Sequence, residues 1–297
     1  MTEAPEYFVL AGQPGRVVKY HRFSSQAMAT TFEILIANDD YNYARQAAQA
    51  AFEHLQFLEG ELSKFVESSD ISRINTAGSG EVLTIGMPAC QCLERAMELN
   101  HRTDGAFDVT FGSKNPAPAK DLLLVDSKQY TVKILQPGVE VDLGGIGKGY
   151  AVDNMSDLLC RWSIESALVN GGCSSIYGFA KTDEKGWPIT IKSPNDRREI
   201  FERLYLNKMA VGGSGLEWGP HIIDTKTNAP VQDNFAAWVV GCDATLADAL
   251  STAFMIMSTE QAENYCRKNP DVAAMVMQGK AAEQEKQIVR FGNWPGD

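Results

Sequence analysis

Glycines and one lysine are concentrated in "VDLGGIGKGYAVD", residues 141–153, between two aspartates. The glycines would let the backbone approach a ligand closely. A helix beginning near Gly149 would offer free N–H groups to an anion, and Lys148 would add a point charge. The stretch matches neither GxxxxGK[ST] nor GxGxxG. A phosphate cradle and a tight strand-to-helix turn with a surface lysine therefore both stay open.

A carboxylate and a hydroxyl lie four residues apart in "LADALSTAF", at Asp248 and Thr252. On a helix these two side chains share one face, which is otherwise apolar. With a main-chain carbonyl from elsewhere, they could supply oxygen ligands to Mg²⁺. The alternative is structural: Asp248 caps the helix and Thr252 bonds back to its own backbone. On this segment alone the structural alternative is favoured.

Two further segments carry polar residues with competing explanations. "GGSGLEWGPHIIDTKTNAP" contains Ser214, His221 and Asp224, but no GxSxG elbow frames the serine, so a hydrolase triad is disfavoured. "TDGAFDVTFG" places Asp108 among apolar residues, where a turn aspartate capping local hydrogen bonds is the simple explanation.

The elements that must position these residues alternate irregularly along the chain. Helical spacing of apolar residues predicts helices over 43–65, 87–105, 150–164, 245–258 and 259–269. Strands are expected over 30–37, 166–172, 188–194, 203–213, 236–242 and 272–279, with two short strands around the Pro-Gly turn of 131–143. This order favours an α+β fold with mixed, largely antiparallel sheets flanked by helices. No repeat or linker divides residues 1–297, so we expect one domain, with two closely packed subdomains as a variant.

The composition of the chain excludes several classes of function. The chain has 297 residues, 44% of them hydrophobic, and a net charge of −11, which argues against a nucleic-acid partner. No apolar run approaches the ~18 residues of a membrane span. The N-terminal residues lack a signal-peptide pattern. A cytoplasmic location is expected for the chain as written, and a periplasmic one if a signal sequence has been removed. The six cysteines form no CxxC pair, so free thiols are expected.

Taken in order, the motifs resemble those of the ApbE-like FAD:protein FMN transferases. The resemblance runs from Met28 to about Met257 through "MATTFEI", "ELSKFVESSDISRIN", "DGAFDVT", "DLGGIGKGYAVD", "ALVNGG", "SGLEWGPHIIDTKTNAPV" and "ADALSTAFMIM". It implies that FAD binds in a cleft with Mg²⁺ on its pyrophosphate. A threonine hydroxyl of a target protein would attack the FMN-side phosphorus, AMP would leave, and FMN would stay attached through a phosphoester.

The resemblance also implies roles for individual residues. The metal ligands would be Asp248, Thr252 and the main-chain carbonyl of Gly145, with Ser251 as a fourth contributor. His221 is the candidate general base, because an imidazole suits proton removal near neutrality; a structural histidine that ties the "HIID" strand to its neighbour, or Asp248 as the proton acceptor, are the alternatives. The flavin-nucleotide contacts would be Met28, Phe65, Ala106, Phe107, Asp108, Asp142, Lys148 and Ile223, with Phe65 as a stacking platform and Asp142 near adenine or ribose.

Several positions depart from the family pattern. The connection "SKNPAPAK" is short, Cys173 stands where relatives usually carry an aspartate, and "SGLEWG" replaces a more polar, tyrosine-containing stretch. Thr225 and Asn228 replace the usual proline and glycine. Three activities stay open: protein flavinyl transfer, Mg²⁺-dependent FAD hydrolysis to FMN and AMP, and FAD binding without catalysis.

Overall fold

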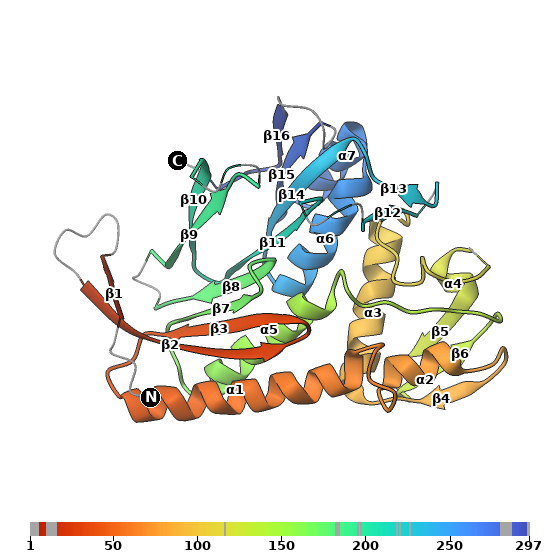
Figure 1. Cartoon of the computed structure of the whole chain (residues 1–297), viewed down its shortest axis with the longest axis horizontal. Helices are drawn as coiled ribbons and strands as arrows, with labels where there is room; N and C mark the ends of the chain where they lie inside the picture. The colour runs from red at the N-terminus through yellow and green to blue at the C-terminus, as the bar shows by residue number, and fades with distance from the viewer. Residues whose placement is uncertain are drawn as a thin grey trace.

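A nine-stranded sheet forms the centre of the fold (Figure 1). The computed structural model describes residues 6–9, 17–115, 117–181, 185–194, 196, 198–217, 219, 221–225, 227–279 and 287–295. Each neighbouring pair of strands in the sheet is antiparallel. The order is β1 (Glu6–Val9), β2 (Val17–Ala27), β3 (Thr30–Ile36), β7 (Ala167–Gly171), β8 (Ser175–Phe179), β11 (Met209–Gly215), β14 (Asn234–Gly241), β15 (Ala273–Gln278) and β16 (Gln287–Phe291).

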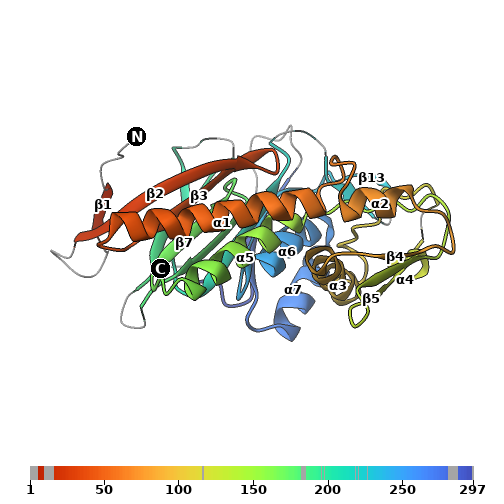
Figure 2. The same cartoon turned by 90° about the horizontal axis from the view of Figure 1, so that it is seen from below.

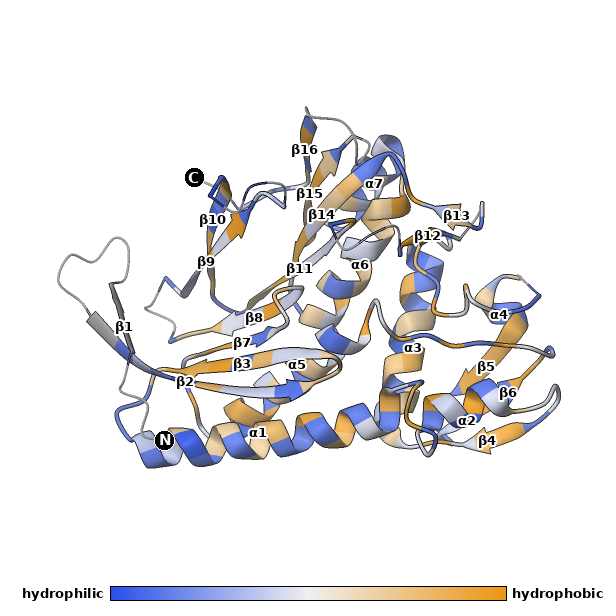
Figure 3. Ribbon diagram, in the orientation of Figure 1, coloured by the Kyte–Doolittle hydropathy of each residue, from blue (hydrophilic) through white to orange (hydrophobic). Residues whose placement is uncertain are grey.

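Helices α1 (Tyr41–Leu62), α5 (Gly147–Arg161) and α6 (Ala244–Ile256) lie together along one side of this sheet (Figure 2). α1 shows why. Its buried residues recur at helical spacing, and Figure 3 shows hydrophobic and hydrophilic bands alternating along it. The Asp40 side chain caps its N-terminus by accepting a hydrogen bond from the amide of Tyr43 at 3.1 Å.

Smaller elements surround this layer. A three-stranded sheet, in the order β4 (Val82–Thr84), β6 (Thr131–Ile134) and β5 (Leu123–Asp126), lies beside α2 (Asp70–Thr76), α3 (Met87–Arg102) and α4 (Ala119–Leu122) (Figure 1). Two hairpins follow, β9 (Trp187–Lys192) with β10 (Ile200–Leu206), and β12 (Ile223–Asp224) with β13 (Ala229–Pro230); α7 (Thr259–Lys268) precedes β15.

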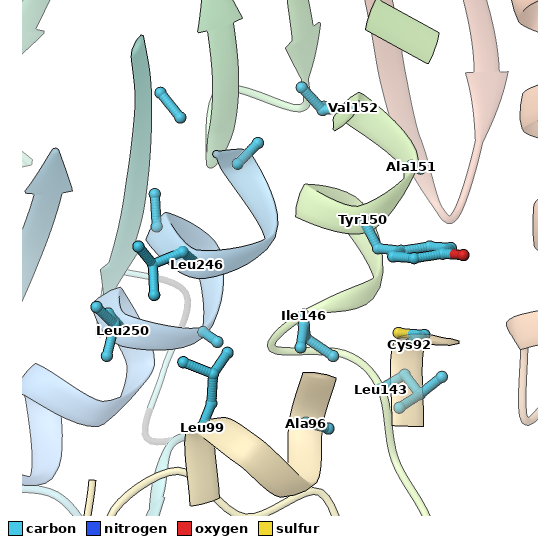
Figure 4. Packing of buried hydrophobic residues seen from close by; sticks show 14 of the residues in the cluster. Cys92, Ala96, Leu99, Leu143, Ile146, Tyr150, Ala151, Val152, Leu246 and Leu250 are labelled. Carbon is cyan, nitrogen blue, oxygen red and sulfur yellow. The ribbon is translucent and has the colours of Figure 1, made fainter. Parts of the chain in front are cut away.

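The core between α3, α5 and α6 fixes the glycine-rich segment (Figure 4). Cys92, Ala96 and Leu99 extend from α3, and Leu246 and Leu250 from α6; all five are buried. Leu143 and Ile146, on the segment that leads into α5, are buried in the same core. Burying each such leucine or isoleucine contributes roughly 1.5–3 kcal/mol. The loop that carries Gly144 and Gly145 is therefore held at both ends by the core.

The structure confirms the α+β fold class and the five main helices, and it corrects two strand predictions. Residues 139–143 are not a strand. The Asn75 amide side chain takes the place of a strand partner: it accepts from the Val141 amide at 2.6 Å and donates to the Val141 carbonyl at 2.9 Å. The segment 203–213 is two strands, β10 and β11, joined by a turn at Asn207 and Lys208, where Lys208 has φ 54°.

The described residues also bear on two further expectations, the free thiols and the membrane span. All six cysteines are free; three are buried, whereas Cys160, Cys173 and Cys242 are exposed. No helix within the described ranges combines the length and apolarity that a membrane crossing requires.

Candidate functional site

Nearly all of the predicted site residues line one cleft of about 830 Å³. It is lined by the turn before Val109, the glycine-rich segment, the turn between β7 and β8, strands β9 and β11, the segment before β12, and α6. The predicted residues in its lining are Ala106, Phe107, Asp108, Asp142, Gly145, Lys148, His221, Ile223, Asp248 and Thr252. Segments more than 100 residues apart in the sequence therefore meet in one cavity.

The α5–α6 contact sets the position of Asp248. Its carboxylate Oδ2 accepts a hydrogen bond of 2.9 Å from the backbone amide of Gly149, and its side chain is almost completely buried. A Cβ at Gly149 would lie 2.2 Å from the carbonyl oxygen of Ala244 and 2.8 Å from the Asp248 Cβ. Only glycine allows the two helices to approach so closely, so this glycine serves packing as well as the cleft.

Three hydroxyl groups extend the polar surface beside Asp248. The Ser214 hydroxyl lies 2.7 Å from that of Ser251 and 3.2 Å from that of Thr252. Ser251 donates to the Asp248 carbonyl at 2.7 Å and is fully buried outside the cleft lining. The backbone of Gly145 is adjacent, because a Cβ built there would lie 3.2 Å from the Thr252 hydroxyl. The side chains of Asp248 and Thr252 therefore line the cleft together, with the backbone of Gly145 beside Thr252.

The glycine-rich segment and its neighbours carry further charges. Asp142 accepts from the Gly144 amide at 2.8 Å and forms an ion pair with Lys64 at 2.9 Å. Lys148 donates to the Gly144 carbonyl at 3.1 Å.

Asp108 has the local bonding of a turn aspartate. It accepts from the amide and the hydroxyl of Thr110 at 2.7 and 2.6 Å. Burial raises the pKa of Asp108, while the Thr110 bonds oppose that rise. The capping explanation for Asp108 is therefore correct, and the carboxylate also lines the cleft.

His221 is exposed at the cleft with one ring nitrogen engaged. Its Nδ1 lies 2.9 Å from the Gly219 carbonyl, which can only accept, so Nδ1 donates this hydrogen bond and, in the neutral ring, Nε2 is the acceptor. Within the described residues Ser214 and His221 share no hydrogen bond, because Ser214 bonds to the α6 hydroxyls instead. This geometry does not support a Ser-His-Asp triad.

Met28 and Phe65 do not line the cleft. Met28 has φ 48°, and its amide donates to the Glu59 carboxylate at 2.7 Å. Phe65 is 89% exposed, with the Lys64 ammonium 5.6 Å from its ring centroid. Their predicted contacts with the flavin would require a ligand that reaches beyond the cleft lining.

Three of the departures from the family pattern lie at the cleft: Cys173, Thr225 and the described part of "SGLEWG" are among its lining residues. Cys173 is at its lining with an exposed thiol and φ 63°, and its amide donates to the Asn170 side chain at 2.8 Å. The Thr225 hydroxyl donates to the Gly105 carbonyl at 2.7 Å. Asn228 has φ 54°, a conformation that asparagine tolerates. Trp218 of the "SGLEWG" segment lies outside the described residues.

Sequence reasoning missed one wall of the cleft. Ile189 to Pro194, together with Ile176, Val211 and Trp238, line it from the side of the β9–β10 hairpin. Nothing in the local pattern of β9 distinguishes a cleft wall from an ordinary edge strand. Within β9 the one residue whose charge could indicate an anionic ligand is Lys192, at the end of the strand.

Comparison with solved structures identifies the fold. The flavin transferase ApbE from Vibrio cholerae superposes with a TM-score of 0.80 at 22% identity, covering 92% of this chain and 97% of that one. The flavinyl transferase ApbE from Pseudomonas stutzeri gives a TM-score of 0.79 at 23% identity, covering 92% and 95%. The chain therefore has the fold of these transferases.

The sequence identifies the family. The model of the ApbE family matches residues 28–276, so the chain belongs to the ApbE family. It is 25% identical to the FAD:protein FMN transferase of Haemophilus influenzae over 289 residues, covering 83% of each chain. It is also 25% identical to the Vibrio cholerae enzyme of the same name over 305 residues, covering 91% of this chain and 90% of the other.

Proposed function

We propose that this protein is an FAD:protein FMN transferase, which moves FMN from FAD to a threonine hydroxyl of a target protein and releases AMP in an Mg²⁺-dependent reaction. One observation carries the proposal: Asp248 and Thr252 line a cleft of about 830 Å³ together with Gly145, whose backbone lies beside Thr252. The names of the curated relatives support the same activity.

The donor set fits Mg²⁺. Carboxylate, hydroxyl and carbonyl oxygens are the ligands that a hard cation prefers. No three His, Cys, Asp or Glu side chains gather into a metal cluster anywhere in the described part of the chain. A cation held by one carboxylate would draw its remaining ligands from water and substrate phosphates, as Mg²⁺ commonly does. When bound, Mg²⁺ would neutralise phosphate charge as a Lewis acid.

The surrounding side chains would hold the rest of FAD. Lys148 lines the cleft and would supply positive charge to a phosphate, whereas the α5 amides of Gly147 and Gly149 already donate to Leu143 and Asp248. Asp142, held by Lys64 and the Gly144 amide, would accept a hydrogen bond from ribose or adenine. Ala106, Phe107 and Ile223 supply apolar surface for a ring, and Asp108 lies among them.

His221 is the base in this proposal. With Nδ1 bonded to the Gly219 carbonyl, Nε2 can take the proton of the attacking hydroxyl. A new oxygen–phosphorus bond forms at the FMN-side phosphorus while the bond to the AMP oxygen breaks. Asp248 is the alternative acceptor, although the Gly149 hydrogen bond occupies one of its oxygens.

A hydrolytic variant of the same chemistry is the second candidate. His221 is exposed to solvent, so water could occupy the position of the threonine hydroxyl. The products would then be FMN and AMP.

The test follows AMP, free FMN and peptide mass after incubation with FAD and Mg²⁺. The acceptor is a threonine-containing flavinylation peptide, and the matched control carries valine at that threonine. A peptide that gains the mass of FMN, with equal AMP, supports transfer. AMP with free FMN and unlabelled peptide would favour hydrolysis, and intact FAD would contradict both.

A further inference from the structure

The charges around the cleft are mostly negative. Four acidic residues are among its lining residues, Asp108, Asp142, Glu217 and Asp248, and two described lysines, Lys148 and Lys192, carry the opposite charge. FAD carries two phosphate charges of the same sign as these carboxylates. The positively charged side chains near the phosphates therefore have a large effect on the affinity of the cleft for a dinucleotide.

The nearby lysines differ in how far they are already engaged. Lys64, beside the cleft, pairs with Glu140 at 3.1 Å and Asp142 at 2.9 Å. Lys148 donates to the Gly144 carbonyl. The exposed ammonium of Lys192 has no hydrogen bond or ion pair with any residue that the structure describes.

The backbone that carries Lys192 is firmly held. Lys192 is the last residue of β9 and pairs with Ile200 of β10. Trp187 and Ile191 of the same strand are buried against Leu204 and Leu206 of β10. The Trp187 ring nitrogen donates to the Phe179 carbonyl at 3.1 Å. A free cation on an anchored strand loses little backbone entropy when it binds an anion.

The strand that carries Lys192 and the helix that carries Asp248 and Thr252 lie on opposite faces of β11 in the nine-stranded sheet. Gly212 of β11 faces α6, because a Cβ there would lie 2.1 Å from the Ala247 carbonyl. Its neighbour Val211 faces the other way and packs in one cluster with Ile191. The cleft lining therefore includes residues of α6 and residues of β9.

We propose that Lys192 is a specificity-determining residue of the cleft that donates a hydrogen bond to a phosphate of bound FAD from the β9 wall. The assignment rests on the proposed function, because it takes FAD as the ligand. It predicts a preference for phosphorylated flavin over riboflavin, whose ring and ribityl chain carry no charge for Lys192 to bind.

The test measures equilibrium binding of FAD, ADP and riboflavin, with no acceptor peptide and no turnover. Lys192→Ala should weaken binding of FAD and ADP by about 5- to 30-fold and leave riboflavin binding unchanged. Lys192→Arg should restore most of the affinity, since it keeps the charge. The salt dependence of FAD binding should also become shallower in Lys192→Ala. Lys128→Ala, an exposed lysine outside the cleft lining, is the matched control and should bind like the wild type.

The outcomes separate the two proposals. Unchanged FAD affinity in Lys192→Ala, with normal binding by the wild type, would overturn the Lys192 assignment alone. An equal loss of riboflavin affinity would also overturn it, by showing a structural effect rather than phosphate binding. A wild-type protein that binds neither FAD nor ADP would overturn the proposed function as well.

Discussion

The backbone amide of Gly149 donates a 2.9 Å hydrogen bond to the carboxylate of Asp248, across 99 residues of sequence. This bond joins the glycine-rich segment to the α6 motif. A methyl group at Gly149 would collide with the Ala244 carbonyl and the Asp248 Cβ. The close approach of α5 and α6 therefore depends on a hydrogen at this position.

Gly149→Ala should separate α5 from α6 and lower the free energy of unfolding by roughly 1–3 kcal/mol, the usual cost of overpacking. Mg²⁺-dependent FAD turnover should fall with it. Gly147→Ala is the control, because its Cβ would meet nothing closer than the Leu143 Cβ at 3.8 Å. Urea unfolding of both variants checks the prediction, and equal stabilities would contradict it.

Asp248→Ala should abolish Mg²⁺-dependent FAD turnover, since it removes the only carboxylate of the proposed donor set. It should also cost about 1–3 kcal/mol of stability, because the buried Gly149 amide loses its acceptor. Asp248→Asn keeps an acceptor oxygen, so it should recover stability without recovering turnover. Near-normal turnover in either variant would refute the metal assignment. Exposed Asp157→Ala serves as the control.

His221→Ala should slow turnover by about 100-fold while FAD affinity stays nearly constant, because a base acts mainly in the transition state. Single-turnover rates and equilibrium FAD binding measure the two effects separately. An equal loss of affinity would mark His221 as a binding or structural residue.

Thr225→Val should open the contact between the β12–β13 hairpin and the turn at Gly105, since it removes the hydroxyl that donates to the Gly105 carbonyl. We expect a loss of about 0.5–1.5 kcal/mol in stability and weaker FAD binding. Thr225→Ser retains the hydroxyl and should behave like the wild type. Identical FAD dissociation constants for the Val and Ser variants would show that the bond does not shape the cleft.

Asp153 gives a pH dependence with a definite sign. Its carboxylate accepts hydrogen bonds from the amides of Ala244 and Thr245 at 2.8 Å, yet burial raises its pKa to about 6. The folded state then holds the proton more tightly than the unfolded state. The stabilisation is complete below about pH 4 and is lost as the pH rises through about 6.

Between pH 4 and 7 the stability of the wild type should therefore fall by roughly 1–3 kcal/mol relative to Asp153→Asn. Unfolding curves of both proteins across this range provide the measurement. Parallel pH profiles would contradict the assignment. Asp157→Asn, at an exposed position of α5, should follow the wild type.

Sequence reasoning succeeded where local periodicity decides the structure. The four-residue spacing of Asp248 and Thr252 predicted a shared helical face, and both residues line the cleft. It failed at 139–143, where a distant Asn75 side chain satisfies the backbone of Val141. The β9 wall could not be predicted either, since only tertiary packing brings Lys192 to the cleft.

The lining of the cleft extends from Ala106 to Ile256 along the sequence. No single helix or hairpin of this chain contains the whole cleft lining, because the lining residues come from different elements. Ligand affinity is therefore coupled to cooperative folding of the whole unit. A ligand present at 100 times its dissociation constant would add about 2.7 kcal/mol to the free energy of unfolding. Bound nucleotide would therefore stabilise the folded chain in addition to serving as its substrate.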